Sequence, residues 1–149
     1  MLIRVLAPLA LIALLTAACS GSSPTAVSPS STGGALAVTS GQLSGTWSLR
    51  SIQPTGQSEQ ATPGGATYTV TFADGRLSTR ADCNTCGGSF TLAGQSLTAG
   101  PALACTRAAC ATMAFENVYT TMLAGESAVA VTGDTLTLSS PRGVLRFTR

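Results

Sequence analysis

Five cysteines are the residues of this sequence whose type and spacing could support chemistry. Four of them form two pairs, a C-x2-C at Cys83 and Cys86 and a C-x4-C at Cys105 and Cys110, with 18 residues between the pairs. This spacing is compatible with two disulfides, with a zinc ion held by four thiolates, or with a redox-active C-x-x-C. Spacing alone does not choose among the three, so the choice depends on the compartment and on the surrounding elements.

The fifth cysteine, Cys19, ends an apolar N-terminal segment. Arg4 supplies a positive charge, and residues 5–15 are then apolar apart from one proline. This run is shorter than the ~20 apolar residues of a membrane-spanning helix and is typical of a secretory signal. Residues 15–19, Leu-Thr-Ala-Ala-Cys, resemble the lipobox of bacterial lipoproteins. The sequence therefore predicts a lipoprotein signal peptide over residues 1–18 and lipidation of Cys19, with an ordinary signal peptide as the alternative.

Residues 19–42 are predicted to be the lipidated cysteine and a flexible tether. The stretch after Cys19 is mostly Ser, Thr, Gly, Pro and Ala, and it contains no aromatic and no charged residue. Its larger apolar residues, Val27, Leu36 and Val38, are too sparse to offset the entropy of ordering the chain. Such a composition is typical of a linker between an anchor and a folded domain.

Export bears on the four remaining cysteines, because an even number of cysteines in an oxidising compartment favours disulfides. The C-x4-C spacing of the second pair disfavours zinc. Gly87 and Gly88 lead from Cys86 into a predicted strand, whereas a thioredoxin-type C-x-x-C needs a helix N-terminus to lower the thiol pKa. Two structural disulfides are therefore the favoured interpretation, with the zinc site and the redox site kept as alternatives.

The register of one predicted hairpin favours a particular pairing. If Leu92 lies opposite Leu97, the same register continued outward brings Cys86 close to Cys105 and leaves Cys83 further out. We therefore predict two nested disulfides, Cys83–Cys110 and Cys86–Cys105. Each of the loops taken alone would contribute about 3–4 kcal/mol in the chain-entropy model.

Residues 43–149 must supply the elements that position these cysteines, and their pattern is mainly β. Apolar and polar residues alternate with a period of two in about eight short segments, separated by Gly- and Asp-containing turns such as Ala73-Asp74-Gly75. This pattern predicts an antiparallel sandwich or small barrel with Trp47 buried. The predicted strands contain residues 47–49, 68–72, 77–81, 90–92, 97–99, 129–131, 136–138 and 144–148.

One segment departs from this period. Apolar residues recur every three or four positions over residues 111–124, which predicts an amphipathic helix that ends at Gly125. We expect its Met and aromatic residues to pack in the core rather than to bind a ligand.

The composition excludes several classes of function. The chain has no His and no Lys, and charged residues make up only 9% of it. Without His, catalysis of the Ser-His-Asp or Cys-His type and His-ligated metal sites are excluded. Eight Arg against six Asp and Glu give a net charge of +2, which is too little for a nucleic-acid-binding face. The six carboxylates are scattered, so we predict no catalytic residues, no metal and no cofactor.

Several short motifs resemble the META-domain family, the HslJ-like bacterial envelope proteins. They are Leu-Ser-Gly-Thr-Trp at 43–47, Asp-Cys-Asn at 82–84 with Gly-Ser-Phe at 88–90, Thr-Arg-Ala-Ala-Cys at 106–110, and Gly-Asp-Thr-Leu-Thr-Leu at 133–138. The resemblance covers residues 43–149 and implies a lipocalin-like β-barrel with one helix and a Cys83–Cys110 pair. It implies no established enzyme activity and a loose link to heat-shock and antibiotic-tolerance responses. The sequence departs from the family at Asp82, where Gly is usual.

We therefore expect a non-enzymatic envelope module, anchored by lipid at Cys19, that binds a protein or small ligand or acts under stress. Ser20 favours sorting to the periplasmic face of the outer membrane in a cell with two membranes. The alternatives are a thiol–disulfide oxidoreductase that uses Cys83 and Cys86, and a small disulfide-stapled inhibitor of hydrolases. Asn84 and Arg107 flank the cysteines, and they are expected to satisfy backbone groups or, as candidates, to contact a partner.

Overall fold

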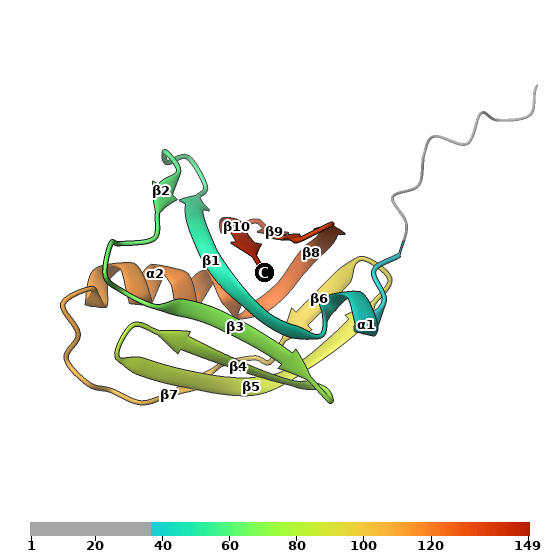
Figure 1. The fold of residues 1–149 in the computed structure, drawn as a ribbon, viewed down its shortest axis with the longest axis horizontal. Helices are drawn as coiled ribbons and strands as arrows, with labels where there is room; N and C mark the ends of the chain where they lie inside the picture. Colours follow the sequence, from blue (N-terminus) through green and yellow to red (C-terminus); the bar gives the residue numbers. More distant parts are fainter. Residues whose placement is uncertain (1–36) are drawn as a thin grey trace, which may run out of the picture. The chain divides into compact units, whose positions relative to one another are not determined.

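The computed structural model describes residues 37–149. They form a closed antiparallel barrel of eight strands, with two additional short strands and one main helix (Figure 1). The predicted mainly β fold with a single amphipathic helix is confirmed. The elements are α1 (Ser40–Leu43), β1 (Gly45–Pro54), β2 (Gln60–Ala61), β3 (Tyr68–Ala73), β4 (Arg76–Ala81), β5 (Asn84–Ala93), β6 (Ser96–Ala99), β7 (Ala104–Cys105), α2 (Met113–Leu123), β8 (Gly125–Thr132), β9 (Thr135–Ser140) and β10 (Gly143–Thr148).

β1 closes the barrel. The strands follow the order β10, β9, β8, β6, β5, β4, β3, β1, and β1 pairs with β10 as well as with β3. The register of the β1–β10 ladder shifts between Leu49 and Ser51, so that Arg50 is an extra residue in β1. A bulge of this kind bends a strand, and β1 is strongly curved in Figure 1. Residues 45–48 therefore pair with β3, and residues 48–54 pair with β10.

The period-two pattern places alternate side chains inside the barrel. In β3, Tyr68, Val70 and Phe72 are buried, and the residues between them are half-buried. The turn to β4 has positive φ angles of 49° at Asp74 and 71° at Gly75, which Asp and Gly tolerate. The turn residues named from the sequence therefore make the turn that the hairpin needs.

A packed core fills the barrel interior, because the inward-facing side chains are large and fully buried. Trp47 is 0% exposed, as predicted, and its Nε1 donates a hydrogen bond of 2.8 Å to the carbonyl oxygen of Leu43. The other largest buried side chains are Tyr119, Phe72, Phe147, Leu43, Ile52, Leu77, Leu97, Leu123, Leu136, Leu138 and Leu145.

The two helices lie at opposite ends of this core. α2 brings Tyr119 edge-on to Tyr68 and Phe147, with ring centroids 5.4 and 6.4 Å apart. At the other end, Leu43 of α1 is buried, and the guanidinium of Arg149 lies 4.1 Å from the centroid of the Trp47 ring. The observed bounds of α2 are slightly shorter than the predicted 111–124, because Thr112 and Ala124 are its capping residues.

The folded unit begins before residue 43, which corrects the end of the predicted tether. Val38 is only 8% exposed, and its N–H donates to the carbonyl oxygen of Gly94 at 3.1 Å. Thr39 and Gln42 form a reciprocal capping box at the start of α1. The reason is local, because a Thr-x-x-Gln capping box starts α1 and the buried Val38 and Leu43 dock this turn onto the barrel. Cys19 and the rest of the predicted tether before residue 37 lie outside the described residues. Among the described residues, no helix has the length and apolarity needed to cross a membrane.

Candidate functional site

Two nested disulfides fasten the segment 104–112, which begins with β7 and forms the later part of the connection from β6 to α2. Cys83 is bonded to Cys110, with Cα atoms 5.8 Å apart, and Cys86 is bonded to Cys105, with Cα atoms 4.0 Å apart. These are the same two pairs that the hairpin register predicted. Cys83 and Cys86 therefore belong to different bridges, and no Cys83–Cys86 bridge of the redox type exists.

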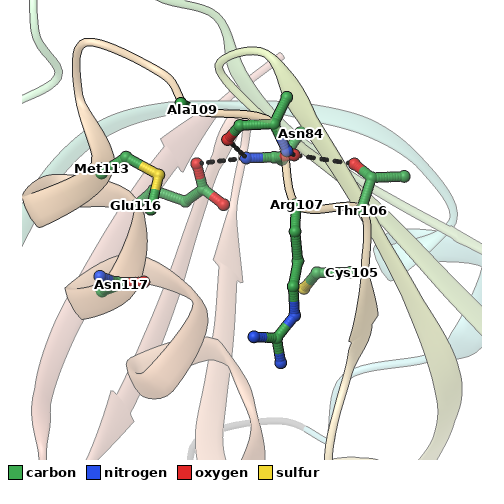
Figure 2. A pocket seen from close by; sticks show the side chains of 9 residues that line it. Asn84, Cys105, Thr106, Arg107, Ala109, Met113, Glu116 and Asn117 are labelled. Atoms are coloured by element: carbon green, nitrogen blue, oxygen red, sulfur yellow. Dashed lines mark hydrogen bonds between the residues drawn. The ribbon is translucent and has the colours of Figure 1, made fainter.

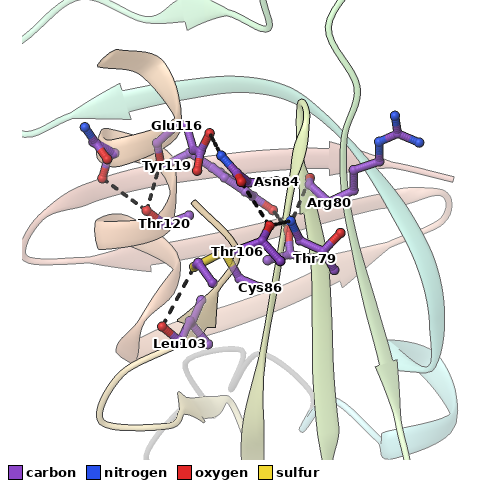
Figure 3. The surroundings of a disulfide bond; sticks show 12 residues. Thr79, Arg80, Asn84, Cys86, Leu103, Thr106, Glu116, Tyr119 and Thr120 are labelled. Atoms are coloured by element: carbon purple, nitrogen blue, oxygen red, sulfur yellow. Dashed lines mark hydrogen bonds between the residues drawn. A yellow bond between two sulfur atoms is a disulfide. The ribbon is translucent and has the colours of Figure 1, made fainter. Parts of the chain in front are cut away.

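The register that places Cys105 opposite Cys86 is not a continuation of the β5–β6 ladder. Leu92 pairs with Leu97 as expected. The ladder of β5 then shifts by two residues, because Cys86 pairs directly with Cys105 on the separate strand β7. Residues 101–103 absorb the shift. The surroundings of the Cys86–Cys105 bridge include Asn84, Thr79 and Tyr119 (Figure 3).

Asn84 is the hub of the site. Its side chain is 1% exposed, and its Nδ2 donates to the carbonyl oxygen of Ala108 and to Oε2 of Glu116, both at 3.0 Å. Its Oδ1 accepts from the backbone N–H of Ala108 at 2.8 Å and from the hydroxyl of Thr106 at 2.9 Å. Figure 2 shows this amide between the 106–109 segment and α2. One side chain therefore holds both backbone groups of Ala108 and links the segment to the helix.

A second chain of hydrogen bonds fixes the start of α2. The hydroxyl of Thr112 donates to Oδ2 of Asp82 at 2.7 Å, so it accepts from the hydroxyl of Tyr68, 2.8 Å away. This explains why Thr112 makes no side-chain cap of α2 although it occupies the N-cap position. Burial raises the pKa of Tyr68, the bond to Thr112 counteracts that rise, and the carboxylates of Asp82 and Glu116 add to it.

Tyr119 ties the middle of α2 to the barrel wall. Its hydroxyl lies 2.7 Å from Oγ1 of Thr79, whose own hydroxyl donates to the carbonyl oxygen of Thr69 at 2.6 Å. Complete burial raises the pKa of Tyr119 well above its ordinary value, and the Thr79 bond only partly offsets this. Tyr119 therefore ties α2 to the barrel wall as a buried, neutral side chain.

A pocket of about 320 Å³ opens between the segment and α2. Its walls are Asn84, residues 105–109, Met113, Glu116 and Asn117. Arg107 is exposed, and Figure 2 shows its side chain extending away from Asn84. Among residues 37–149 no hydrogen bond or ion pair to the Arg107 guanidinium occurs. The pocket thus combines a buried carboxylate and amide with a free cation at its edge.

The buried polar side chains of the site are paired with groups of the protein itself. Within the described part of the chain, no group of three or more His, Cys, Asp or Glu could hold a metal ion. The same part contains no buried side-chain nitrogen or oxygen without a hydrogen-bond partner. The polar groups of the site are therefore occupied in holding the segment in place.

Comparison with known proteins agrees with this fold. The family model of the META domain matches residues 41–149. The chain belongs to the META domain family. This family is not known to be enzymatic. No curated protein matches the chain.

Two solved structures resemble this META domain. One is an NMR structure of a protein from Burkholderia xenovorans, which is 26% identical with a TM-score of 0.61 and covers 74% of this chain and 85% of its own. The other is an NMR structure of a protein that is 28% identical with a TM-score of 0.59, covering 74% of this chain and 94% of its own. Both similarities concern the fold, so the site must be interpreted from the residues of this chain.

The two polar residues that flank the cysteines of this META domain, Asn84 and Arg107, have different surroundings in the structure. Asn84 satisfies both backbone groups of Ala108, as expected of it, and because it is buried it lacks the free surface that the alternative, a partner contact, would need. Its place directly after the Asp82–Cys83 turn carries it under the segment. Arg107 is exposed and remains a candidate contact. Cys19 lies outside the described residues.

Sequence reasoning missed the buried carboxylate of this META domain. Glu116 is 6% exposed, although it was counted among scattered carboxylates. A signal was present, because Glu116 shares a helical stripe with Tyr119 and Leu123, three and seven positions later. Asp82 has a positive φ of 56°. Glycine adopts such a φ freely, and Asp tolerates it better than most residues, so Asp can stand where the family usually has Gly.

Proposed function

We propose that this protein is a lipid-anchored, non-enzymatic module of the bacterial envelope that binds a protein or small ligand through the outside of its barrel. The observation that carries the proposal is the packed interior, because a barrel whose inward side chains are 0–8% exposed uses its volume for stability. Function must then lie on the surface, where a fastened segment and an exposed helix side meet.

The exposed side of α2 is the part of this surface most suited to a partner. Met113 and Val118 are the exposed large hydrophobic residues of the described chain, at 42% and 37% exposure. Asn117 lies between them and lines two pockets, the one beside Arg107 and a second of about 480 Å³ near Val118. We call residues Met113, Asn117 and Val118 the helix face. Apolar side chains rimmed by polar ones are typical of an interaction site.

The anchor rests on the sequence. The lipobox before Cys19 and the uncharged tether support attachment to a membrane by lipid, and Ser20 favours the periplasmic face of an outer membrane where there is one. The bridges count against the oxidoreductase alternative, since a C-x-x-C redox centre needs its two cysteines to pair with each other.

Two measurements test the proposal. Growth with labelled palmitate should label the wild-type chain and leave Cys19→Ala unlabelled and soluble, while Cys110→Ala keeps the label. A photo-crosslinking residue at Asn117 should give a discrete cross-linked species in the native envelope. The matched control is the same residue at Thr135, which is exposed at the start of β9. An unlabelled wild-type chain would refute the anchor, and equal cross-linking from both positions would refute the binding face.

A further inference from the structure

Arg107 differs from its two neighbours in how its side chain is held. Its side chain is exposed and free, whereas Thr106 and Ala108 on either side are each held by the buried Asn84. Arginine keeps its charge at any physiological pH. A single free cation between two immobilised residues is a specificity element that a partner with a recessed carboxylate would recognise.

The backbone around Arg107 is extended and fixed in advance. Residues 104–110 run without a turn or bend, and none of them has a positive φ. The N–H of Thr106 donates to the carbonyl oxygen of Thr85 at 3.0 Å, which continues the β5–β7 ladder. Cys105 and Cys110 bond the two ends of the segment to β5 and to the turn before it. A partner that binds extended chain therefore meets little cost of ordering.

Small side chains surround the arginine. Ala108 and Ala109 follow it and are exposed, and Thr106 precedes it. An extended segment with one long basic side chain and small neighbours has the shape of a substrate for a serine protease that cleaves after arginine, whose specificity pocket has a carboxylate at its base.

We propose that residues 105–110 form a substrate-like inhibitory loop for an arginine-specific serine protease, with Arg107 entering the specificity pocket. This inference rests on the proposed function, because it names the class of partner that the module binds. In this proposal the guanidinium of Arg107 is the group that the protease recognises, and Asn84 keeps the loop in its bound conformation. A rigid, fully pre-ordered loop is the feature by which protease–inhibitor complexes reach high affinity from an interface of standard size.

The hydrogen bonds from Asn84 to Ala108 also explain why the protease would not convert the loop into a permanently cleaved product. The protease serine oxygen attacks the carbonyl carbon of Arg107, the bond to the Ala108 nitrogen breaks, and that nitrogen takes a proton from the protease's general acid. The products are an ester on the serine and a free amine on Ala108. Asn84 and the Cys83–Cys110 bridge hold this amine in place. The amine returns its proton and attacks the ester, which re-forms the peptide bond and restores the serine hydroxyl.

The test uses the full chain in detergent micelles and trypsin as the probe, with a chromogenic arginine anilide as the reporter substrate. Wild-type chain should inhibit trypsin competitively and remain uncut. Arg107→Ala should weaken inhibition by about 100-fold or more, and Arg107→Lys by less than about 10-fold, because lysine also fits an acidic pocket. Arg107→Phe should transfer inhibition to chymotrypsin. Arg76→Ala, which removes an exposed arginine of β4, is the matched control and should change nothing.

Far-ultraviolet circular dichroism on each variant establishes that it is folded. Rapid cleavage after Arg107 would overturn the inference, and so would the absence of inhibition at about 100 µM, where a complex with a Kd of about 1 µM would be nearly saturated. Equal losses in Arg107→Ala and Arg76→Ala would do the same. If wild-type chain fails to inhibit trypsin but still cross-links from position 117, this inference alone is wrong. If both fail, the proposed binding module is wrong as well.

Discussion

Replacing Asn84 by Ala tests whether one buried amide holds the segment 104–112 to the barrel and to α2. The side chain makes three hydrogen bonds to Thr106 and Ala108 and one to the carboxylate of Glu116, besides a weak bond to Sγ of Cys110 that is left out of the sum. Neutral bonds of this kind contribute ~1 kcal/mol each, and a bond to a charged group ~1.5–3 kcal/mol. Their sum is about 4.5–6 kcal/mol. Water that enters the vacated space recovers part of it, so we expect a loss of about 4 kcal/mol.

Urea unfolding measures this loss under conditions that keep both disulfides intact. Trp47 is the single tryptophan of the chain and is fully buried, so its fluorescence reports on the core. With a slope of about 2 kcal/mol/M, the unfolding midpoint of Asn84→Ala should fall by about 2 M. Asn117→Ala is the matched control, because Asn117 is an exposed asparagine on α2, the helix to which Asn84 bonds. That control should change stability by less than about 0.5 kcal/mol.

A double-mutant cycle isolates the bond between Asn84 and Glu116. Once Asn84 has been removed, Glu116→Ala should cost less than it does in the wild type, with a coupling energy of about 1.5–3 kcal/mol. A loss below about 1 kcal/mol for Asn84→Ala, or a coupling near zero, would refute the role of Asn84 as the hub.

Three further predictions concern the backbone, the tyrosines and the bridges. Gly143→Ala should lower the free energy of unfolding by more than about 3 kcal/mol. The reason is that the added Cβ would lie 2.2 Å from the Gln53 carbonyl oxygen, at a φ of 136°. In the control Gly133→Ala the added Cβ meets open space, so urea unfolding should show a loss of only about 1 kcal/mol. Burial raises the pKa of Tyr119 and Tyr68 above the ordinary 10.0, so stability should be complete below pH 10 and fall above it. The slope is up to ~1.4 kcal/mol per pH unit for each tyrosine, and Tyr119→Phe should flatten an alkaline titration of stability, whereas an unchanged slope would contradict its burial. Non-reducing peptide mapping should find both nested bridges, and graded reductant should open Cys83–Cys110 before Cys86–Cys105, because Cys86 is only 1% exposed. A Cys83–Cys86 peptide would show that the pairing is wrong.

The parts of the fold that local pattern controls could be predicted from the sequence. In β3 and β4 every second residue faces the core, and the Asp74-Gly75 turn allows one register. The Leu92–Leu97 pair followed from its turn in the same way. That register brought Cys86 near Cys105, and the disulfide pairs followed from it even though the ladder shifts before β7.

Other parts depend on contacts between distant segments and have no periodic signal. β2 and β7 are two residues long, and a two-residue strand cannot alternate. Asn84 is a residue type that is common in turns. It is buried because the segment that the bridges hold lies over it. The sequence places Val38 in the tether, because one apolar residue contributes little burial by itself. Its burial depends on the capping box of α1, which is visible in the sequence.

The closure of the barrel through β1 has a consequence for biogenesis. Because the first long strand pairs with the last, residues 48–54 lack their β10 partner until residues 143–148 are available. Arg149 then completes the structure by covering Trp47 and bonding to the carbonyl oxygen of Gln42. A chain that emerges N-terminus first therefore cannot close this barrel before residues 143–148 have emerged. If the protein is exported as we propose, barrel closure would follow translocation, in the compartment where the cysteines would also meet an oxidant.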